Sequence, residues 1–395
     1  MADRYWIASS AGNWNDTANW STTSGGSGGA SVPGSSDTAY FDGNGTGDCT
    51  VNVNINVTGI NLVKEYTGTF DGSSYDVTIG TGGFDWDIGY TGNPAGGTLD
   101  LGSGDWTCSG NFGWGRLTDQ LVDSGHTLTL TGTGKTFDPW FAGGESLFRT
   151  VTIDTGATIT WPASYNCEVN DLLHVKGTLT LGSSYTENKL TAGVNSGTYD
   201  RDLTIDTGGE VAGSNTLEHR WYNGVGDFVN NGTISCAKVI FIGYKNPGSD
   251  FDFGTITSDE VYFNEFAQTQ IPIAAGTYDL PGNIFINLPN GSSAWNYNGS
   301  AKEVNINYGG DVTVTALGNY TKGTGTITFN GDDTQEIDFN GEATEDWDID
   351  TTGTVQLTGA VDPDNITITD GTLDVNGNNV SSGQLTMAAG TSLID

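Results

Sequence analysis

Short apolar–polar–apolar segments recur through this chain about every 20 residues, and this repeat limits the possible folds more than any other feature. Within each segment apolar and polar residues alternate, as in a β-strand with one buried and one exposed face. In the C-terminal half the segments follow one another at an almost constant spacing. They begin at Val239, Val261, Ile284, Val304, Ile327, Trp347, Ile366 and Leu385.

The N-terminal half carries the same repeat less regularly, and a Gly-containing turn with a second alternating segment follows many of the repeats. Two or three short strands in about 20 residues are typical of a β-solenoid, in which stacked coils bury one apolar face. A propeller blade needs about 40 residues, and the strands of a sandwich pair as hairpins. The sequence therefore predicts an all-β fold, a right-handed parallel β-helix of about fifteen coils with an N-terminal aromatic cap.

Composition agrees with this fold class and excludes several partners. Gly contributes 60 residues, and no window shows the apolar period of a helix. The formal net charge of −35 excludes nucleic acid as the expected partner, because phosphate binding needs clustered Lys and Arg. No apolar run reaches about 18 residues, so no membrane insertion is expected. The first residues lack the basic and apolar regions of a signal peptide, which predicts synthesis in the cytoplasm without export by the general route.

The four cysteines, Cys49, Cys108, Cys167 and Cys236, are far apart along the chain and almost evenly spaced. With coils about 4.8 Å apart, successive cysteines are separated by almost three coils, or about 14 Å. A disulfide needs Cα atoms within about 7 Å of each other, so these thiols should stay reduced and buried. The sequence has no CxxC pair and its three histidines are scattered, so neither a metal site nor a cofactor is expected.

Aromatic residues are concentrated at the N-terminus, where a solenoid needs a cap over its apolar interior. We interpret residues 1–48 as a Trp-rich cap with a Gly/Ser linker, and residues 49–395 as the solenoid. A sugar-binding patch is the alternative for the same aromatic residues. The expected cap residues are Tyr5, Trp6, Trp14, Trp20, Tyr40 and Phe41.

The N-terminal pattern contains two Asn-Trp pairs, then Val-Pro, then DTAYF before the first alternating strand. It resembles the N-terminal part of β-helical virion proteins of phages, of the fibre or decoration type. Related patterns occur in autotransporter-like bacterial passengers. The resemblance covers residues 4–60 by motif and the remainder by style of repeat. It implies a β-helical fold and a structural role, and it transfers no functional residue to this chain.

The repeat lengthens in three intervals, 99–128, 172–203 and 203–239. Insertions into a solenoid are expected to leave it as longer loops, and loops are frequent recognition sites. Exposed aromatic rings near these loops are candidates for stacking on sugars, with neighbouring arginines in support; covering the edge of an insertion is the alternative role. The candidate partner- or glycan-contacting residues are Trp114, Arg116, Trp140, Arg220, Trp221 and Tyr222.

Catalytic patterns are weak in this sequence. Carboxylate pairs such as Asp85/Asp87, Asp332/Asp333 and Asp348/Asp350 suit glycoside hydrolysis in type, but with 48 acidic residues such pairs arise by chance. No catalytic residue is therefore assigned. The Asp-rich turn at 362–365 offers oxygen ligands for Ca²⁺, but a solvated acidic turn is the preferred interpretation.

These observations favour a non-enzymatic structural protein on the exterior of a phage virion, as a capsid decoration, fibre or tail-appendage component. Its expected partners are other virion proteins and further copies of itself, with host-surface polysaccharide as a candidate ligand. Lysis releases virion proteins without an export signal, which suits the N-terminal sequence. The alternatives are a tailspike-like enzyme that degrades polysaccharide and a secreted bacterial adhesin or passenger domain.

Overall fold

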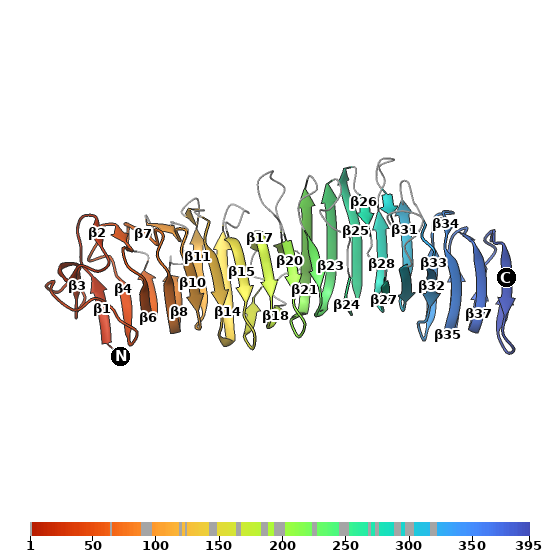
Figure 1. The fold of residues 1–395 in the computed structure, drawn as a ribbon, viewed down its shortest axis with the longest axis horizontal. Coiled ribbons are helices and arrows are strands. Elements are labelled where there is room, and N and C mark those ends of the chain that lie inside the picture. The colour runs from red at the N-terminus through yellow and green to blue at the C-terminus, as the bar shows by residue number, and fades with distance from the viewer. Residues whose placement is uncertain are drawn as a thin grey trace. The chain divides into compact units, whose positions relative to one another are not determined.

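The computed structural model describes residues 2–63, 65–87, 97–117, 121–122, 125–141, 148–162, 167–182, 189–192, 202–222, 227–244, 253–267, 270–272, 276–287, 294–296, 304–316 and 322–395. Within these ranges the only helical element is the three-residue 3-10 helix η1 (Thr17–Asn19). About 11 parallel-strand turns of a β-solenoid can be followed in them (Figure 1). The predicted all-β solenoid is confirmed. By their contacts the residues form two units, Met1–Ala192 (unit 1) and Gly193–Asp395 (unit 2).

The strands of unit 1 belong to two sheets. The main sheet contains β1 (Ala2–Trp6), β3 (Trp20–Ser21), β4 (Asp37–Phe41), β6 (Ile55–Val63), β8 (Val77–Asp87), β10 (Asp105–Cys108), β11 (Phe112–Leu117), β13 (Thr127–Leu130), β14 (Thr133–Phe141), β15 (Phe148–Ile153), β16 (Thr158–Trp161), β17 (Cys167–Val175), β18 (Thr178–Leu181) and β19 (Lys189–Ala192). The second sheet contains β2 (Gly12–Asn13), β5 (Cys49–Thr50), β7 (Thr69–Asp71), β9 (Thr98–Asp100) and β12 (Leu121–Val122).

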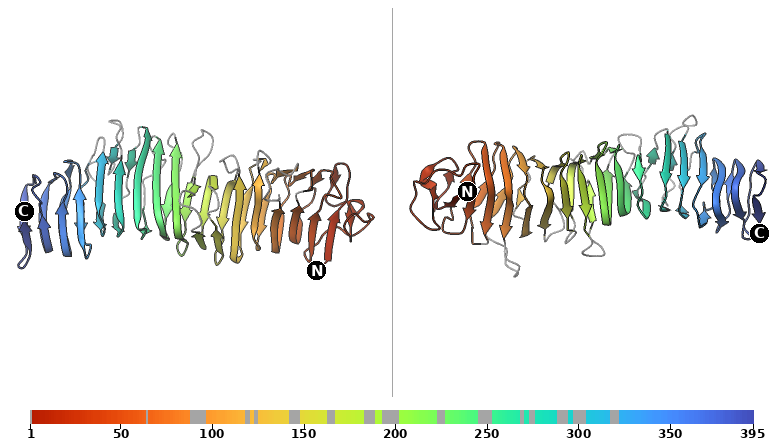
Figure 2. Two further views of the ribbon diagram at one scale, coloured as in Figure 1. Left: turned by 180° about the vertical axis from the view of Figure 1, so that it is seen from behind. Right: turned by 90° about the horizontal axis from the view of Figure 1, so that it is seen from below.

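Three strands make one turn of the solenoid in unit 1. The turn of β9, β10 and β11 is followed by the turn of β12, β13 and β14, and each strand pairs in parallel with its equivalent. Leu121 lies beside Leu99 and Leu128 beside Trp106, so one turn takes the same length of chain on both faces. Figure 2 shows the same succession of strands from two further sides.

This register explains the long step of the repeat in 99–128, and the longer loop expected there stays a prediction. Leu99 lies on β9 and Leu128 on β13, which belong to different faces, so the long step between them measures no insertion. The interval 203–239 has the same explanation in unit 2, because Leu203 pairs with Phe228 and Leu217 pairs with Val239. Much of the third interval, 172–203, lies outside the described residues.

Unit 2 continues the same type of architecture. Its main strands are β20 (Asp202–Ile205), β21 (Glu210–Tyr222), β22 (Phe228–Asn230), β23 (Thr233–Tyr244), β24 (Thr255–Ile256), β25 (Glu260–Ala267), β27 (Gly276–Leu280), β28 (Asn283–Asn287), β30 (Val304–Tyr308), β31 (Val312–Ala316), β32 (Thr326–Phe329), β33 (Thr334–Asp338), β35 (Asp346–Leu357), β37 (Asn365–Asp374), β38 (Gln384–Met387) and β39 (Ser392–Ile394). Two small sheets pair β26 (Gln270–Pro272) with β29 (Ala294–Asn296), and β34 (Ala343–Thr344) with β36 (Asp362–Pro363).

Alternation along these strands builds the core of unit 2 from rows of stacked apolar residues. One row runs across β23, β25, β28 and β31, and a second runs across β30, β32, β35 and β37. All the residues of both rows are buried. The first row contains Val239, Val261, Ile284 and Val312; the second contains Ile306, Ile327, Trp347 and Ile366.

The tryptophans of the N-terminal segment pack against one another inside unit 1. Trp6, Trp14 and Trp20 are each at most 1% exposed, and Phe41 packs beside all three. The indole of Trp20 donates to the carbonyl of Trp14 at 2.7 Å. Strand β3 pairs antiparallel with β1, whose other edge pairs in parallel with β4. The first parallel strand therefore has both edges paired.

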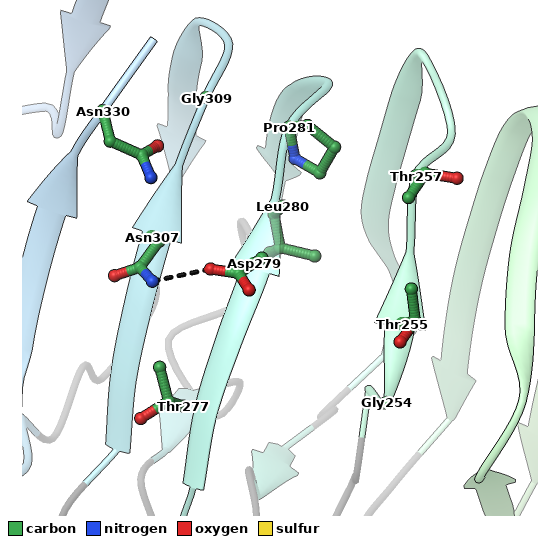
Figure 3. A pocket seen from close by; sticks show the side chains of 10 residues that line it. All are labelled: Gly254, Thr255, Thr257, Thr277, Asp279, Leu280, Pro281, Asn307, Gly309 and Asn330. Atoms are coloured by element: carbon green, nitrogen blue, oxygen red, sulfur yellow. Dashed lines mark hydrogen bonds between the residues drawn. The ribbon is translucent and has the colours of Figure 1, made fainter. Parts of the chain in front are cut away.

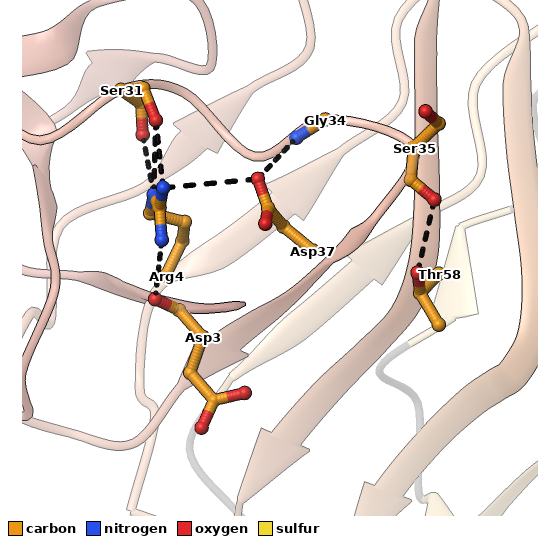
Figure 4. A network of polar contacts seen from close by, with 7 residues as sticks. All are labelled: Asp3, Arg4, Ser31, Gly34, Ser35, Asp37 and Thr58. Carbon is orange, nitrogen blue, oxygen red and sulfur yellow. Dashed lines mark hydrogen bonds and ion pairs between the residues drawn. The ribbon is translucent and has the colours of Figure 1, made fainter. Parts of the chain in front are cut away.

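The Gly/Ser run expected as a linker is hydrogen-bonded to the segments that carry this aromatic cluster. The backbone N of Gly29 donates to the carbonyl of Thr17, at 2.9 Å. The Arg4 guanidinium donates to the carbonyl and hydroxyl of Ser31 and lies 4.0 Å from the carboxylate of Asp37 (Figure 4). A Cβ on Gly28 would lie 2.2 Å from the carbonyl oxygen of Ala18, so this close approach requires glycine.

The last two strands of unit 2 differ from the others in their exposure. Strands β38 and β39 pair in parallel with β37. Leu385, Met387, Leu393 and Ile394 are between 42% and 49% exposed. The partners of the first three on β37, Ile366, Ile368 and Leu373, are buried, whereas Ile394 pairs with the half-buried Asp374. Residues 375–394 include no charged residue, in a chain with 48 acidic ones.

The cysteines behave as the spacing predicted. Cys49, Cys108, Cys167 and Cys236 are all free and all buried. Each lies on a different strand, with its side chain in the apolar interior of its own unit. They act here as small apolar residues of the core.

Candidate functional site

A groove on the outer surface of unit 2 is the candidate site (Figure 3). Its volume is about 390 Å³, which lies in the range of ligand-binding pockets. Strands β24, β27 and β30 line it, together with residues just after β24, β27, β30 and β32. Its polar residues are Thr255, Thr257, Thr277, Asp279, Asn307 and Asn330; the others are Gly254, Leu280, Pro281 and Gly309.

Strand alternation places the polar side chains outside the solenoid. In β27 the side chains of Tyr278 and Leu280 are buried, and Thr277 and Asp279 are therefore exposed. In β30 the side chain of Asn307 points to the same surface and lies directly across the ladder from Asp279. The regular pairing of β27 with β30 thus brings a carboxylate and an amide together.

Hydrogen bonds fix the orientation of these groups. Asn307 Nδ2 donates to Asp279 Oδ1 at 2.6 Å. Asn305 and Thr277 form the next outward-facing pair on the same two strands, and Asn305 Nδ2 donates to Thr277 Oγ1 at 3.4 Å. Asn305 Oδ1 accepts from the backbone N of Thr326 at 2.9 Å. These contacts set which end of each amide is the donor. The second carboxylate oxygen of Asp279 is left as an acceptor facing the groove.

The groove carries one charge. Among its ten lining residues Asp279 is the only ionisable one, and none is Lys or Arg. Carboxylate, amide and hydroxyl groups supply both donors and acceptors at short range. Chemically, the arrangement suits a ligand rich in hydroxyl groups and carrying no negative charge.

The six residues predicted to contact a partner lie on strands and not in loops. Trp114 and Arg116 lie in β11, Trp140 in β14, and Arg220, Trp221 and Tyr222 at the end of β21. Trp114 is paired on its two sides with Trp86 and Pro139. Apart from that of Arg220, the side chains of these six lie outside the described part of the chain. Their contact with a partner stays a prediction.

Arg220 has a partner within its own strand. Its guanidinium forms an ion pair with the carboxylate of Glu218, which is fully buried. Burial of a carboxylate is costly unless a positive group accompanies it. The pair therefore gives Arg220 a structural role in unit 2.

Two of the carboxylate pairs considered for catalysis lie on the outer surface, and the side chain of Asp87, from the third pair, lies outside the described part of the chain. Asp348 and Asp350 flank the buried Ile349 on β35, and the hydroxyl of Thr369 donates to Asp348 at 2.7 Å. Asp332 and Asp333 lie in the turn between β32 and β33. The described residues contain no group of three or more His, Cys, Asp or Glu side chains arranged to hold a metal ion.

Comparisons with known proteins give no family for this chain. No family of known proteins, no curated protein and no solved structure matches it. In the described residues, no helix has the length and apolar character needed to cross a membrane.

The groove residues are not among the candidates predicted from the sequence, because those candidates are aromatic residues and arginines near the lengthened intervals. The segment VNINY at Val304 is one of the alternating segments, and its alternation puts Asn305 and Asn307 on the face opposite Val304 and Ile306. The signal was the succession of Thr, Asp and Asn at outward positions of neighbouring strands. Without the register, however, the sequence does not show that Asp279 and Asn307 are neighbours.

Proposed function

We propose that this chain is a non-enzymatic structural protein of the exterior of a phage virion, as a capsid decoration, fibre or tail-appendage component. The observation that carries the proposal is the parallel solenoid itself. Its strands are joined by backbone ladders and its interior is filled by stacked apolar residues, which suits a rigid spacer. The resemblance of residues 4–60 to virion proteins supports the location at the virion surface.

The finer features of the fold belong to the same proposal. We take the solenoid to be right-handed, because crossovers between parallel strands almost always are. A turn of about 22 residues over residues 49–395 corresponds to about fifteen coils. Residues 1–48 act as its cap, supported by the antiparallel pairing of β3 with β1 and by the buried tryptophans. An experimental density map tests handedness and coil number together.

The proposed partners are other virion proteins and a second copy of this chain. The surface proposed for self-association is formed by β38 and β39, with Leu385, Met387, Leu393 and Ile394 exposed. Edge strands are usually protected from pairing by charged residues, and none is present in 375–394. Elsewhere, two chains that each carry a net charge of −35 repel one another.

Quantitative mass spectrometry of purified particles tests the proposed location. A virion component should be present at a fixed ratio to the major capsid protein through repeated purification. Absence from particles, with the chain found instead on the bacterial surface, would favour the adhesin alternative. Release of reducing ends from bacterial polysaccharide by the purified protein would favour the tailspike-like enzyme.

A further inference from the structure

We propose that the groove of β24, β27 and β30 binds a neutral polysaccharide. The sequence already made polysaccharide a candidate ligand, and the proposal places it on residues different from the aromatic candidates. It does not depend on whether the protein belongs to a virion. It is based on the shape of the groove, its hydrogen-bonding groups, its preorganisation and its charge.

The polar groups of the groove match the hydroxyl groups of a sugar ring. Asp279 offers carboxylate oxygens as acceptors, and Asn307 offers an amide group beside them. The distance from Asn307 Nδ2 to Asp279 Oδ1 is 2.6 Å. An acceptor and an amide at adjacent positions can each bind one hydroxyl of a vicinal diol. Hydrogen bonds to a charged group are the stronger kind, so Asp279 should contribute most to binding. Thr277 adds a hydroxyl group on the same strand as Asp279, and Thr257 adds one just after β24.

The groove is preorganised. Its polar residues are Thr, Asp and Asn, whose short side chains lose little rotamer freedom on binding compared with Lys, Arg or Gln. Strand β30 is paired on both edges, with β27 and with β32, so the backbone that carries Asn307 is fixed. A fixed site avoids part of the ordering cost that weakens binding to flexible loops.

Pairing of β30 on both edges argues against a peptide that adds as a strand at Asn307. A peptide that binds a sheet usually adds as a strand to an open edge. Asn307 lies between β27 and β32, so no edge of β30 is open there. At Asn307 a ligand must therefore be recognised through outward side chains, and the groove presents hydroxyl, amide and carboxylate groups there.

Charge selects among polysaccharides. A uronate or phosphate placed in the groove would meet the carboxylate of Asp279 without any lining cation, in a chain of net charge −35. Like charges in contact oppose binding. A neutral chain of hexoses is repelled neither by Asp279 nor by the net charge of the protein. Its repeated hydroxyl groups match the polar side chains that successive strands present in the groove.

Affinity electrophoresis of the full chain tests the proposal. The probes are three neutral polysaccharides, dextran, galactomannan and xyloglucan, and two anionic ones, alginate and polygalacturonate. The binding variant is the double substitution Asp279→Ala with Asn307→Ala. The control variant is Asp346→Ala with Asn365→Ala, because Asn365 Nδ2 also donates to Asp346 Oδ1, at 2.7 Å, on exposed positions of neighbouring strands outside the groove.

We expect at least one neutral polysaccharide to retard the wild-type protein and the control variant equally, and the anionic polysaccharides to retard neither. The binding variant should lose about tenfold or more in affinity for that polysaccharide. Its melting temperature should be close to that of the control variant. The proposal is wrong if no neutral polysaccharide retards the protein, if the anionic ones bind as well, or if the binding variant and the control behave alike. These results are independent of the particle analysis, so each proposal can fail alone.

Discussion

Buried side chains of the N-terminal segment stabilise the folded protein, and Trp20 shows this most clearly. It packs edge-on against Trp14 at 4.8 Å and against Trp6 at 5.3 Å, and it is fully buried. Replacing Trp20 by Ala should lower the free energy of unfolding by about 3–5 kcal/mol, because it leaves a large cavity. Tyr40 is the control, since it stacks on Tyr5 at the surface and its replacement by Ala should cost much less. Chemical denaturation followed by tryptophan fluorescence measures both; equal losses would contradict the buried cluster.

The buried thiols give a second prediction at this scale. Burial raises the pKa of Cys49 well above its usual range, and raises the pKa of Cys108 and of Cys236 to about 11. At pH 8 the native thiols are therefore protonated and inaccessible, and a thiol-specific reagent should label them only after unfolding. Rapid labelling of any cysteine in the native protein, counted by mass spectrometry, would show that the core is open.

The same thiols set a pH dependence of stability. In the unfolded chain a thiol ionises near pH 8.5, whereas Cys108 and Cys236 stay protonated until about pH 11 in the folded protein. The folded state then binds more protons, so the contribution of these two thiols to the free energy of unfolding should be constant below about pH 8 and fall between about pH 8.5 and pH 11. Denaturation at a series of pH values measures this. The variant with Ala at both positions should be less stable but should show a smaller fall.

At the scale of the strand, alternation decides which substitutions are tolerated. Ile327 and Thr328 are neighbours on β32, with Ile327 buried in the stacked row and Thr328 on the outer surface. Replacing Ile327 by Asn should cost about 3 kcal/mol or more, because a polar amide enters the apolar row. Replacing Thr328 by Asn should change stability by less than about 0.5 kcal/mol. Urea denaturation of the two variants provides the comparison, and similar midpoints would contradict the assigned faces.

Strand existence could be predicted from the sequence, but strand register could not. The segments at Ile284 and Val304 have the spacing of consecutive coils. In the structure, however, Ile284 lies beside Val312, and Val304 lies beside Gly276 on another face. Both faces carry the same alternation, so a sequence period cannot distinguish one face from the next. The same ambiguity created apparent insertions and concealed the pairing of Asp279 with Asn307.

The all-β composition of the whole molecule should be evident in solution. The only helix among the described residues is the single 3-10 turn at Thr17–Asn19. Far-UV circular dichroism should therefore give a β-type spectrum with negligible helical signal. A strong double minimum of α-helix would be incompatible with the solenoid.

Self-association through β38 and β39 is the prediction for the assembled molecule. Leu385 and Leu393 are 43% and 44% exposed, so replacing both by Lys should leave the folded monomer nearly as stable as before. It should also add charge where none exists in 375–394 and oppose strand pairing between copies. Sedimentation velocity over a concentration series should show wild-type oligomers and a monomeric double variant. The control places the same two charges at Ser9 and Ser10, on the exposed surface of unit 1, and should associate like the wild type. A wild-type protein that stays monomeric at every concentration, or a Lys variant that still associates, would exclude this surface as the interface.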